Sequence, residues 1–382
     1  MFKKKSAAMS IALMLFASHA GGGFATGNQA STYFVGLGSM GILSSVIAVG
    51  LLCLILREAF VMYNEEGHTS YKSFFKSLYS PFDRLYLVFE AFFNIMVIMV
   101  VATTISGAAS AILEFVGVNY KVAAFLVSAA ILILSIFGAD LVRKLSAAMG
   151  MIILISSLSI YFVGIIRADS LGSMLSFDLR ANGAENFGQA IANGFIYAGF
   201  QCVQIPAMLA VSGVLKSRAE TSKSMAIAFI INSLALGMSV VMLLGWKDLT
   251  GGSALPTLTA TKAMGYGWMS AFYAISLILC LLSSGISIIF GFVSRFENIE
   301  ILEDIRSVKA RRALIAGFII GVSTLISLFG LTNIIKYGYG YCGYVAIAFI
   351  IIPILTKAAY RNRKVNYALE RVRVREDKDG IY

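Results

Sequence analysis

The stretch "HAGGGFATGNQ", residues 19–29, permits two interpretations of the apolar segment that leads into it. Lys3 to Lys5 come before an apolar run from Ala7 to Phe16, a pattern typical of a secretory signal peptide. Ser18 and Ala20 are small enough for a cleavage site. The glycines are equally typical of a transmembrane helix that is interrupted within the membrane. The rest of the chain has to decide between the two.

Composition defines the broad class of protein. Of the 382 residues, 58% are apolar and only 13% are charged, and the mean hydropathy is +0.82, which excludes a soluble globular domain. Apolar runs long enough to cross a hydrocarbon core of about 30 Å recur along the chain. They should all be helical, because backbone polar groups in lipid need internal partners. We predict ten such helices, at about residues 6–33, 36–62, 84–113, 121–138, 142–166, 188–215, 223–246, 268–293, 312–329 and 331–358.

Positive charge predicts the orientation of these helices. If both termini are cytoplasmic, the cytoplasmic segments hold 25 of the 31 Lys and Arg residues, as expected from the positive-inside rule. Residues 168–187 and 247–267 are then the long outer loops. The net charge of +11 therefore reflects membrane topology rather than a nucleic-acid partner. The prediction is a multi-pass protein with both termini in the cytoplasm.

A second interruption lies half a chain later, in "QAIANGFIYAGFQCVQIPAML", residues 189–209. Gly194 follows Gly21 by 173 positions, so five predicted helices precede this interruption and five begin with it. An odd number of helices per half means that the halves are inverted in the membrane. Paired interruptions of this kind point to a transporter site near the midplane. The alternative is that the glycines only let helices pack closely.

Three motifs carry a resemblance to a known family. "GGGFATGNQ" (21–29), "FIYAGFQ" (195–201) and "NIIKYGYGYCGY" (333–344) resemble the YkvI-type membrane proteins of bacteria, within the amino acid-polyamine-organocation transporter superfamily. The resemblance implies an all-α, LeuT-like fold, with a 5+5 inverted repeat and helices 1 and 6 broken. It also implies alternating access to a central site between helices 1, 3, 6 and 8. It favours the interpretation that the first helix is retained in the protein and interrupted within the membrane, rather than removed as a signal peptide. Family members tend to carry an acidic residue at the position of Gln29.

The resulting domain organisation has four parts. Residues 1–166 form the first five-helix repeat and 167–187 an outer loop, while 188–359 form the second, inverted repeat and 360–382 a charged cytoplasmic tail. The expected location is the cytoplasmic membrane of a bacterium.

Candidate solute-binding residues come from the two interruptions and from the third helix. Unwound backbone can bind a solute through its free N–H and C=O groups, while aromatic and amide side chains suit a small zwitterion or amine. For Tyr197 and Phe200 the alternative is ordinary helix packing. The predicted set is Gly21, Gly22, Gly23, Phe24, Ala25, Thr26, Gly27, Asn94, Asn193, Tyr197, Gly199, Phe200 and Gln201.

The sequence leaves two candidates for the coupling ion, sodium and the proton. The resemblance implies a sodium site in which Ser283 and Ser284 join the carbonyls of Gly21 and Phe24, an all-oxygen ligand set that suits a hard cation. Serine hydroxyls can instead bond to their own helix. Proton coupling would use His19 or Glu90, because ionisable groups at membrane depth are functional candidates. His19 can also be structural, and Glu90 can extend to the membrane surface.

These patterns predict a secondary transporter of a small organic solute, an amino acid or an amine, coupled to sodium or protons. The alternative is a nutrient-sensing membrane receptor of the spore-germination type without net transport. We expect no enzyme activity, no metal site and no cofactor apart from Na⁺ as coupling ion, since no catalytic or metal-ligand motif is visible. The predicted partners are the solute and the lipid bilayer, with no nucleic acid. The oligomeric state stays open.

Overall fold

The computed structural model describes residues 7–19, 21–137, 139–169, 171–296, 305 and 307–364. In these ranges seven helices are long and apolar enough to cross a membrane, and three shorter apolar helices bring the number to ten. We number the ten segments spans 1 to 10 in chain order. The prediction of an all-helical, multi-pass membrane protein is confirmed.

The first half of the chain contains spans 1 to 5. Span 1 consists of three short helices, and the amphipathic helix α5, which begins with a capping box between Ser70 and Ser73, connects spans 2 and 3. The elements are α1 (Ala7–His19), α2 (Gly22–Ala25), α3 (Asn28–Tyr33), η1 (Val35–Leu37), α4 (Ser39–Glu65), α5 (Tyr71–Tyr79), η2 (Asp83–Leu85), α6 (Tyr86–Val116), α7 (Tyr120–Phe137) and α8 (Ala139–Ile166).

The second half contains spans 6 to 10. Two short helices, α12 and α13, connect spans 7 and 8, and span 10 includes three π-helical stretches, η5 to η7. The elements are α9 (Leu171–Gln201), η3 (Cys202–Gln204), α10 (Ile205–Ser212), α11 (Arg218–Gly245), α12 (Lys247–Thr250), α13 (Pro256–Ala263), α14 (Gly267–Phe296), α15 (Val308–Ser327), α16 (Leu331–Asn333), η5 (Ile334–Tyr339), α17 (Gly340–Ala346), η6 (Ile347–Ile351) and η7 (Ile354–Ala358).

Several contacts between helices repeat when each span is exchanged for the one five places later or earlier. Span 1 packs on span 7 (α1 on α11), and span 6 packs on span 2 (α9 on α4) in the same way. Span 3 packs on span 9 (α6 on α15), and span 8 packs on span 4 (α14 on α7). The pairs 3–8 and 4–9 map onto themselves. This exchange symmetry is the internal repeat expected of the LeuT-like fold.

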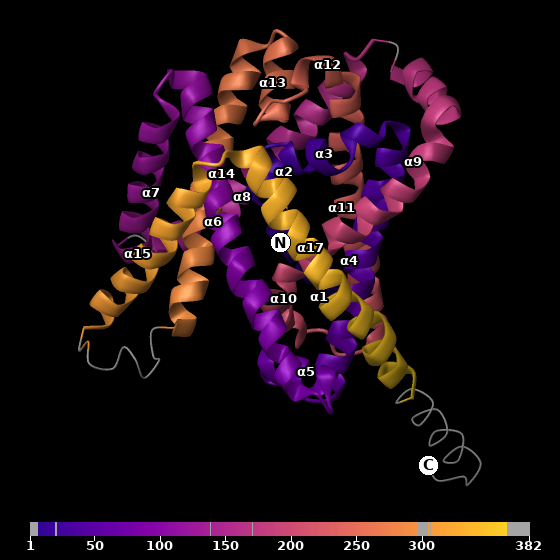
Figure 1. Cartoon of the computed structure of the whole chain (residues 1–382), viewed down its shortest axis with the longest axis vertical. Coiled ribbons are helices and arrows are strands. Elements are labelled where there is room, and N and C mark those ends of the chain that lie inside the picture. Colours follow the sequence, from indigo (N-terminus) through magenta and orange to yellow (C-terminus); the bar gives the residue numbers. More distant parts are fainter. Residues whose placement is uncertain are drawn as a thin grey trace, which may run out of the picture.

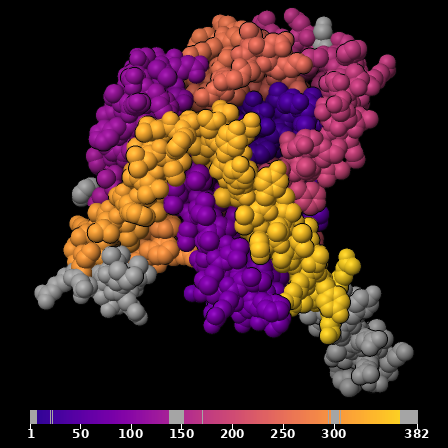
Figure 2. Space-filling model, viewed as in Figure 1, coloured from indigo at the N-terminus to yellow at the C-terminus, as the bar shows by residue number. Residues whose placement is uncertain are grey.

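The two ends of the molecule differ. Helices α12 and α13 lie at one end and α5 lies at the other, so we call these the α13 end and the α5 end (Figure 1). Span 10 crosses the face shown in Figure 2, and α5 and α6 are visible between it and α15. Lys357 and Arg361 bond to backbone carbonyls of α5 and its C-terminus, which fixes the last turns of span 10 at the α5 end.

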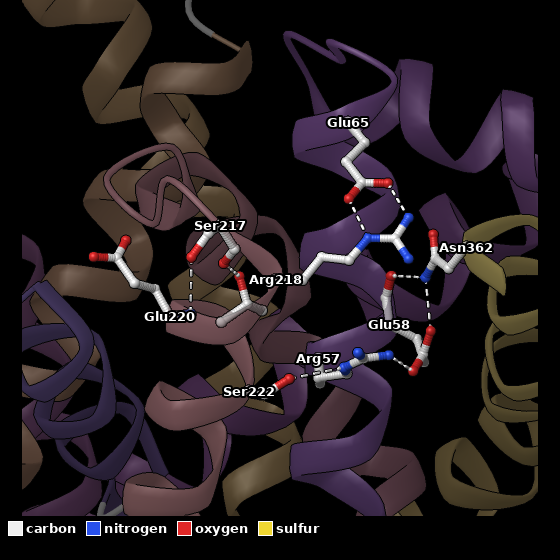
Figure 3. A network of polar contacts seen from close by, with 9 residues as sticks. Arg57, Glu58, Glu65, Ser217, Arg218, Glu220, Ser222 and Asn362 are labelled. Carbon is white, nitrogen blue, oxygen red and sulfur yellow. Dashed lines mark hydrogen bonds and ion pairs between the residues drawn. The ribbon is translucent and has the colours of Figure 1, made fainter. Parts of the chain in front are cut away.

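Ionic contacts join three spans at the α5 end (Figure 3). Arg218, at the start of span 7, forms two charge-assisted bonds with Glu65 at the end of span 2. Arg57 pairs with Glu58, and Asn362 of span 10 donates to both the carbonyl and the carboxylate of Glu58. Two-point Arg–carboxylate contacts of this kind fix geometry more strongly than single bonds do.

The structure adds to one expectation from the sequence and corrects another. Residues 171–187, which the prediction assigns to an outer loop, are helical and continuous with span 6. Asn193, Gly194, Gly199 and Gln201 also lie within helix α9, so span 6 is not unwound at these positions. Its interruption comes later, as the 3₁₀ turn η3 at Cys202–Gln204 that precedes Pro206. Gly194 and Gly199 serve close helix crossings instead, against Ile47 of α4 and Gly343 of α17.

Candidate functional site

Span 1 is broken at the predicted glycines, and its own backbone stabilises the break. Gly21 O accepts the N–H groups of Phe24 and Ala25 at 3.0 and 3.1 Å, and Phe24 O accepts that of Gly27 at 2.9 Å. The Thr26 hydroxyl donates to Gly23 O at 2.9 Å. Gly27 has a φ of 78°, a left-handed conformation that favours glycine. These short turns replace the helical bonds that the break removes.

The break is covered from the α13 end. The Thr257 N–H of α13 donates to Thr26 O at 3.3 Å, and a Cβ atom on Gly27 would overlap the Thr257 hydroxyl. Asn28 donates to Ala254 O at 3.0 Å and to the Thr332 hydroxyl at 2.8 Å. The loop between spans 7 and 8 and the start of span 10 therefore close directly over the break.

A buried chain of polar side chains crosses the break. His19, at the end of α1, contacts Asn232 Oδ1 of span 7 through Nδ1 and the Tyr197 hydroxyl of span 6 through Nε2, both at 2.8 Å. The Tyr197 hydroxyl also contacts Gln29 Oε1 of α3 at 3.1 Å. All four side chains are at most 4% exposed. The chain thus connects the two halves of span 1 through Tyr197 of span 6, and Asn232 of span 7 holds His19 from the other side.

The predicted aromatic residues lie on the same side of the break. Tyr197 and Phe200 are each 1% exposed, with ring centroids 4.8 Å apart. Tyr33 of α3 lies 5.3 Å from Phe200, and Tyr339 of span 10 lies 5.1 Å from it. Phe24 lies 5.4 Å from His19, as measured between ring centroids. In this conformation the rings pack against one another, so they couple spans 1, 6 and 10.

The other span 6 candidates lie in helix contacts. A Cβ atom on Gly199 would lie 2.5 Å from Gly343 O, so α9 and α17 cross at this glycine pair. Asn193 donates to Tyr33 O at 2.6 Å, at the end of α3. Gln201 accepts a bond of 2.6 Å from Gln204 across the 3₁₀ turn.

The predicted sodium ligands lie on neighbouring elements. Ser283 is 6% exposed, and α14, which carries both serines, packs on α2. The carbonyls of Gly21 and Phe24 already accept backbone N–H groups, so each offers only its second lone pair to an ion. Ser284 also interacts with Cys280 one turn earlier in its own helix. The sodium site therefore remains a prediction.

Glu90 and Asn94 lie far from the break along span 3. Gly107 of α6 faces the break, since a Cβ atom at this position would lie 3.5 Å from Thr26 Cγ2. Glu90 is 17 residues earlier in the same helix, or about 25 Å at 1.5 Å per residue. Glu90 forms an ion pair with Arg295 of α14 and accepts a bond of 3.0 Å from the Tyr71 hydroxyl. It thus belongs to the ionic contacts of the α5 end.

One face of α14 shows from which end the break can be reached. Tyr273 donates to Ala25 O at the break, and Cys280 and Ser284 follow on the same face at helical spacing. Tyr273 and Cys280 are 0% and 6% exposed, and Ser284 is half-buried. Ser287 and Gly291, further along this face toward the α5 end, are exposed. The break is covered on the α13 side, and the exposure of this α14 face increases toward the α5 end.

A cavity lies beside the break, between spans 1, 5 and 7. Its lining is mainly apolar, and the hydroxyl-bearing residues Ser157 and Tyr161 contribute from span 5. The lining residues are Phe16, Phe24, Ala25, Ile153, Leu154, Ser157, Leu158, Tyr161 and Ala235. Phe24 and Ala25 were predicted, whereas the residues from spans 5 and 7 were not, because they belong to plain apolar runs without a motif.

The structure also brings in residues that sequence reasoning missed. Gln29, Tyr33, Asn232 and Thr257 all contact the break or its immediate partners. Gln29 stood within the quoted motif, and a buried amide at Asn232 in an apolar span is a signal that a search for polar residues could have found. Tyr33 and Thr257 carry no such signal.

Comparison with known proteins supports the architecture. No family profile matches the chain, and no curated protein sequence matches it. Its structure is similar to that of the Eremococcus coleocola manganese transporter in complex with an aromatic bis-isothiourea substituted compound. The TM-score is 0.57 at 15% identity, over 92% of this chain and 78% of the other. The structure of a mutant of that transporter matches with a TM-score of 0.57 at 14% sequence identity, over 93% of this chain and 81% of the other. This likeness shows the fold, and the predicted LeuT-like architecture is confirmed.

Proposed function

We propose that this protein is a secondary active transporter of a small organic solute, an amino acid or an amine, and that it works by alternating access. The observation that carries the proposal is the broken span 1. Its backbone interruption is closed from the α13 end by contacts of Thr257 and Asn28, while the α14 face beside it becomes exposed toward the α5 end, which we interpret as the accessible side. One-sided access to a central break is what alternating access requires.

The chemistry around the break favours an organic solute. The side chains nearest to it are amide, hydroxyl, imidazole and aromatic groups, from Gln29, Thr26, His19, Tyr197 and Phe24. Amides and hydroxyls donate and accept hydrogen bonds, and aromatic faces attract cations, so these groups suit an amine or a zwitterion. A divalent metal such as Mn²⁺ prefers carboxylate oxygens.

The sidedness of this conformation follows from charge. The α5 end carries Arg57, Arg218, Arg295 and Arg361 in its contacts, which by the positive-inside rule makes it the cytoplasmic end. The structure would then be closed to the outside and accessible from the cytoplasm. We further propose that the chain is related to the YkvI-type proteins of bacterial cytoplasmic membranes.

A ligand screen on the purified protein tests this function. Amino acids, amines and Mn²⁺ are added singly, each with and without sodium, and the unfolding temperature is measured, since a ligand that binds only the folded state stabilises it. We expect stabilisation by an amine or amino acid. A sodium requirement for that effect would support the Ser283 and Ser284 site. Stabilisation by Mn²⁺ alone would contradict the proposed solute class.

A second candidate function is nutrient sensing, as in spore-germination receptors of similar architecture. Binding alone does not separate it from transport, because both functions need a solute site. The separation comes from uptake into liposomes, where a receptor binds its ligand without moving it.

A further inference from the structure

The orientation of two amides determines the hydrogen atoms around His19. Asn232 Nδ2 donates to Ala228 O at 2.8 Å, which leaves Asn232 Oδ1 directed at His19 Nδ1. Because Oδ1 can only accept, Nδ1 carries a hydrogen. Gln29 directs Oε1 at the Tyr197 hydroxyl, which donates to it at 3.1 Å, and its amide nitrogen lies beside Gly23. The two acceptor oxygens thus belong to amides on either side of the His19–Tyr197 pair.

The Tyr197 hydroxyl has one hydrogen and two neighbours that could accept it, His19 Nε2 and Gln29 Oε1. If the imidazole is neutral, Tyr197 donates to Nε2, and Gln29 Oε1 loses its donor. If Nε2 is protonated, it donates to the Tyr197 oxygen, and Tyr197 donates to Gln29. The protonated state therefore satisfies all three contacts at once, and the neutral state satisfies two.

We propose that His19 is a proton-binding site of this transporter and that Tyr197 transmits its protonation to Gln29 across the break in span 1. The inference rests on the proposed transport function and names its coupling ion. A proton on Nε2 adds the Tyr197–Gln29 bond, which joins α1 and span 6 to α3. Proton binding and the closure of the two halves of span 1 then favour each other, which is the reciprocity that coupling requires.

The surroundings of His19 contain polar groups but no charge that would fix its state. The groups facing the ring are Asn232 from α11, Tyr197 from α9 and Phe24 from α2. Tyr33 is the next titratable group, with its ring 6.0 Å from that of Tyr197. In α10, which also packs on α1, no residue is titratable. Among the described residues the printed polar contacts of the ring are to Asn232 Oδ1 and the Tyr197 hydroxyl, and these two oxygens act against the cost of burying a charged imidazolium.

A proton must reach a ring that is buried in this conformation. His19 is itself 3% exposed, but Ala17 and Ser18, the two preceding residues of α1, are exposed, and Gly21 is half-buried. A movement of α1 would therefore be enough to hydrate the ring.

The direct test is a titration of ¹⁵N-histidine in the full-length protein by NMR, with His19→Gln used to assign the His19 signals and His68 as internal reference. We expect wild-type His19 to change from the Nδ1–H form to the doubly protonated form as pH falls. Tyr197→Phe keeps the ring packing but removes the acceptor of Nε2–H. Its titration midpoint should fall by about one to two pH units, a 10- to 100-fold loss of proton affinity. Asn232→Asp should raise the midpoint.

Gln29→Leu is the decisive variant, because Gln29 does not touch His19. Without the Gln29 acceptor, the Tyr197 hydroxyl loses the bond that it gains when His19 is protonated, so we expect a several-fold lower proton affinity of His19. Thermal unfolding identifies any variant that fails to fold. If Tyr197→Phe fails to fold, Gln29→Leu and Asn232→Asp still test the proposal. An unchanged midpoint in Gln29→Leu, or a wild-type His19 that stays neutral from pH 4 to 9, would overturn the proposal. This titration needs no transport, so its outcome is separate from that of the proposed function.

Discussion

Replacing Gly27 by alanine should open the cover over the break. Gly27 has a φ of 78°, and placing alanine in this left-handed conformation costs about 1–2 kcal/mol. The new Cβ would also overlap the Thr257 hydroxyl and lie 3.0 Å from Thr257 N, an overpacking that costs about 1–3 kcal/mol. Together the penalty is about 2–5 kcal/mol. Moving α13 away relieves only the overlap, about 1–3 kcal/mol, so the closed state loses about 5-fold to 150-fold in population relative to the open one.

Hydrogen exchange measures this opening. The Thr257 N–H is bonded to Thr26 O only while α13 lies over the break, so peptides from α13 should exchange faster in Gly27→Ala by up to that factor. Gly36→Ala is the matched control, since no atom lies within 4 Å of its Cβ position. Adding Thr257→Ala to Gly27→Ala should slow exchange again, because it removes the overlapping hydroxyl. Wild-type exchange in Gly27→Ala would refute the close contact between the break and α13.

Three further changes test the contacts between spans. Gly199→Ala should lower the free energy of unfolding by about 1–3 kcal/mol, because its Cβ would lie 2.5 Å from a backbone carbonyl. Gly317→Ala is the control, since its Cβ would enter open space and should leave the free energy of unfolding unchanged. Thermal unfolding measures both. Arg218→Lys should lose the two-point contact with Glu65 and lower the free energy of unfolding by at most about 1 kcal/mol. A double-mutant cycle with Glu65→Gln measures the coupling energy, and a larger value would show that this pair is more than an ordinary surface ion pair. Ser287→Cys should react with a membrane-impermeant thiol reagent from the cytoplasmic side alone, and reaction from the outside would reverse the assigned access.

The sequence predicted most of the fold because lipid restricts the possible structures so strongly. Ten apolar runs of spanning length had to be helices, and an odd number per half implied inversion. The break in span 1 was also predictable, since "GGGFATGNQ" concentrates glycine within one apolar span. The helical structure of residues 171–187 was not predicted, since the sequence analysis treated this segment only as an outer connection.

The site was less predictable, because glycine has two uses that composition cannot separate. At Gly27 it permits a left-handed turn, while at Gly199 it permits a crossing with Gly343. The partner of each glycine lies far along the chain, at Thr257 and Gly343 respectively, so no local pattern distinguishes them. Likewise His19 was visible as a buried ionisable group, but its partners Asn232 and Gln29 became known only from tertiary packing.

The measurement that tests the central claim most directly is uptake of the solute found in the ligand screen by liposomes that contain the purified protein. We predict accumulation driven by a sodium or proton gradient, with Gly27→Ala impaired and Gly36→Ala like the wild type. A pH gradient should suffice if His19 binds the coupling proton. Saturable binding of the same solute without uptake under either gradient would contradict alternating-access transport and favour a receptor.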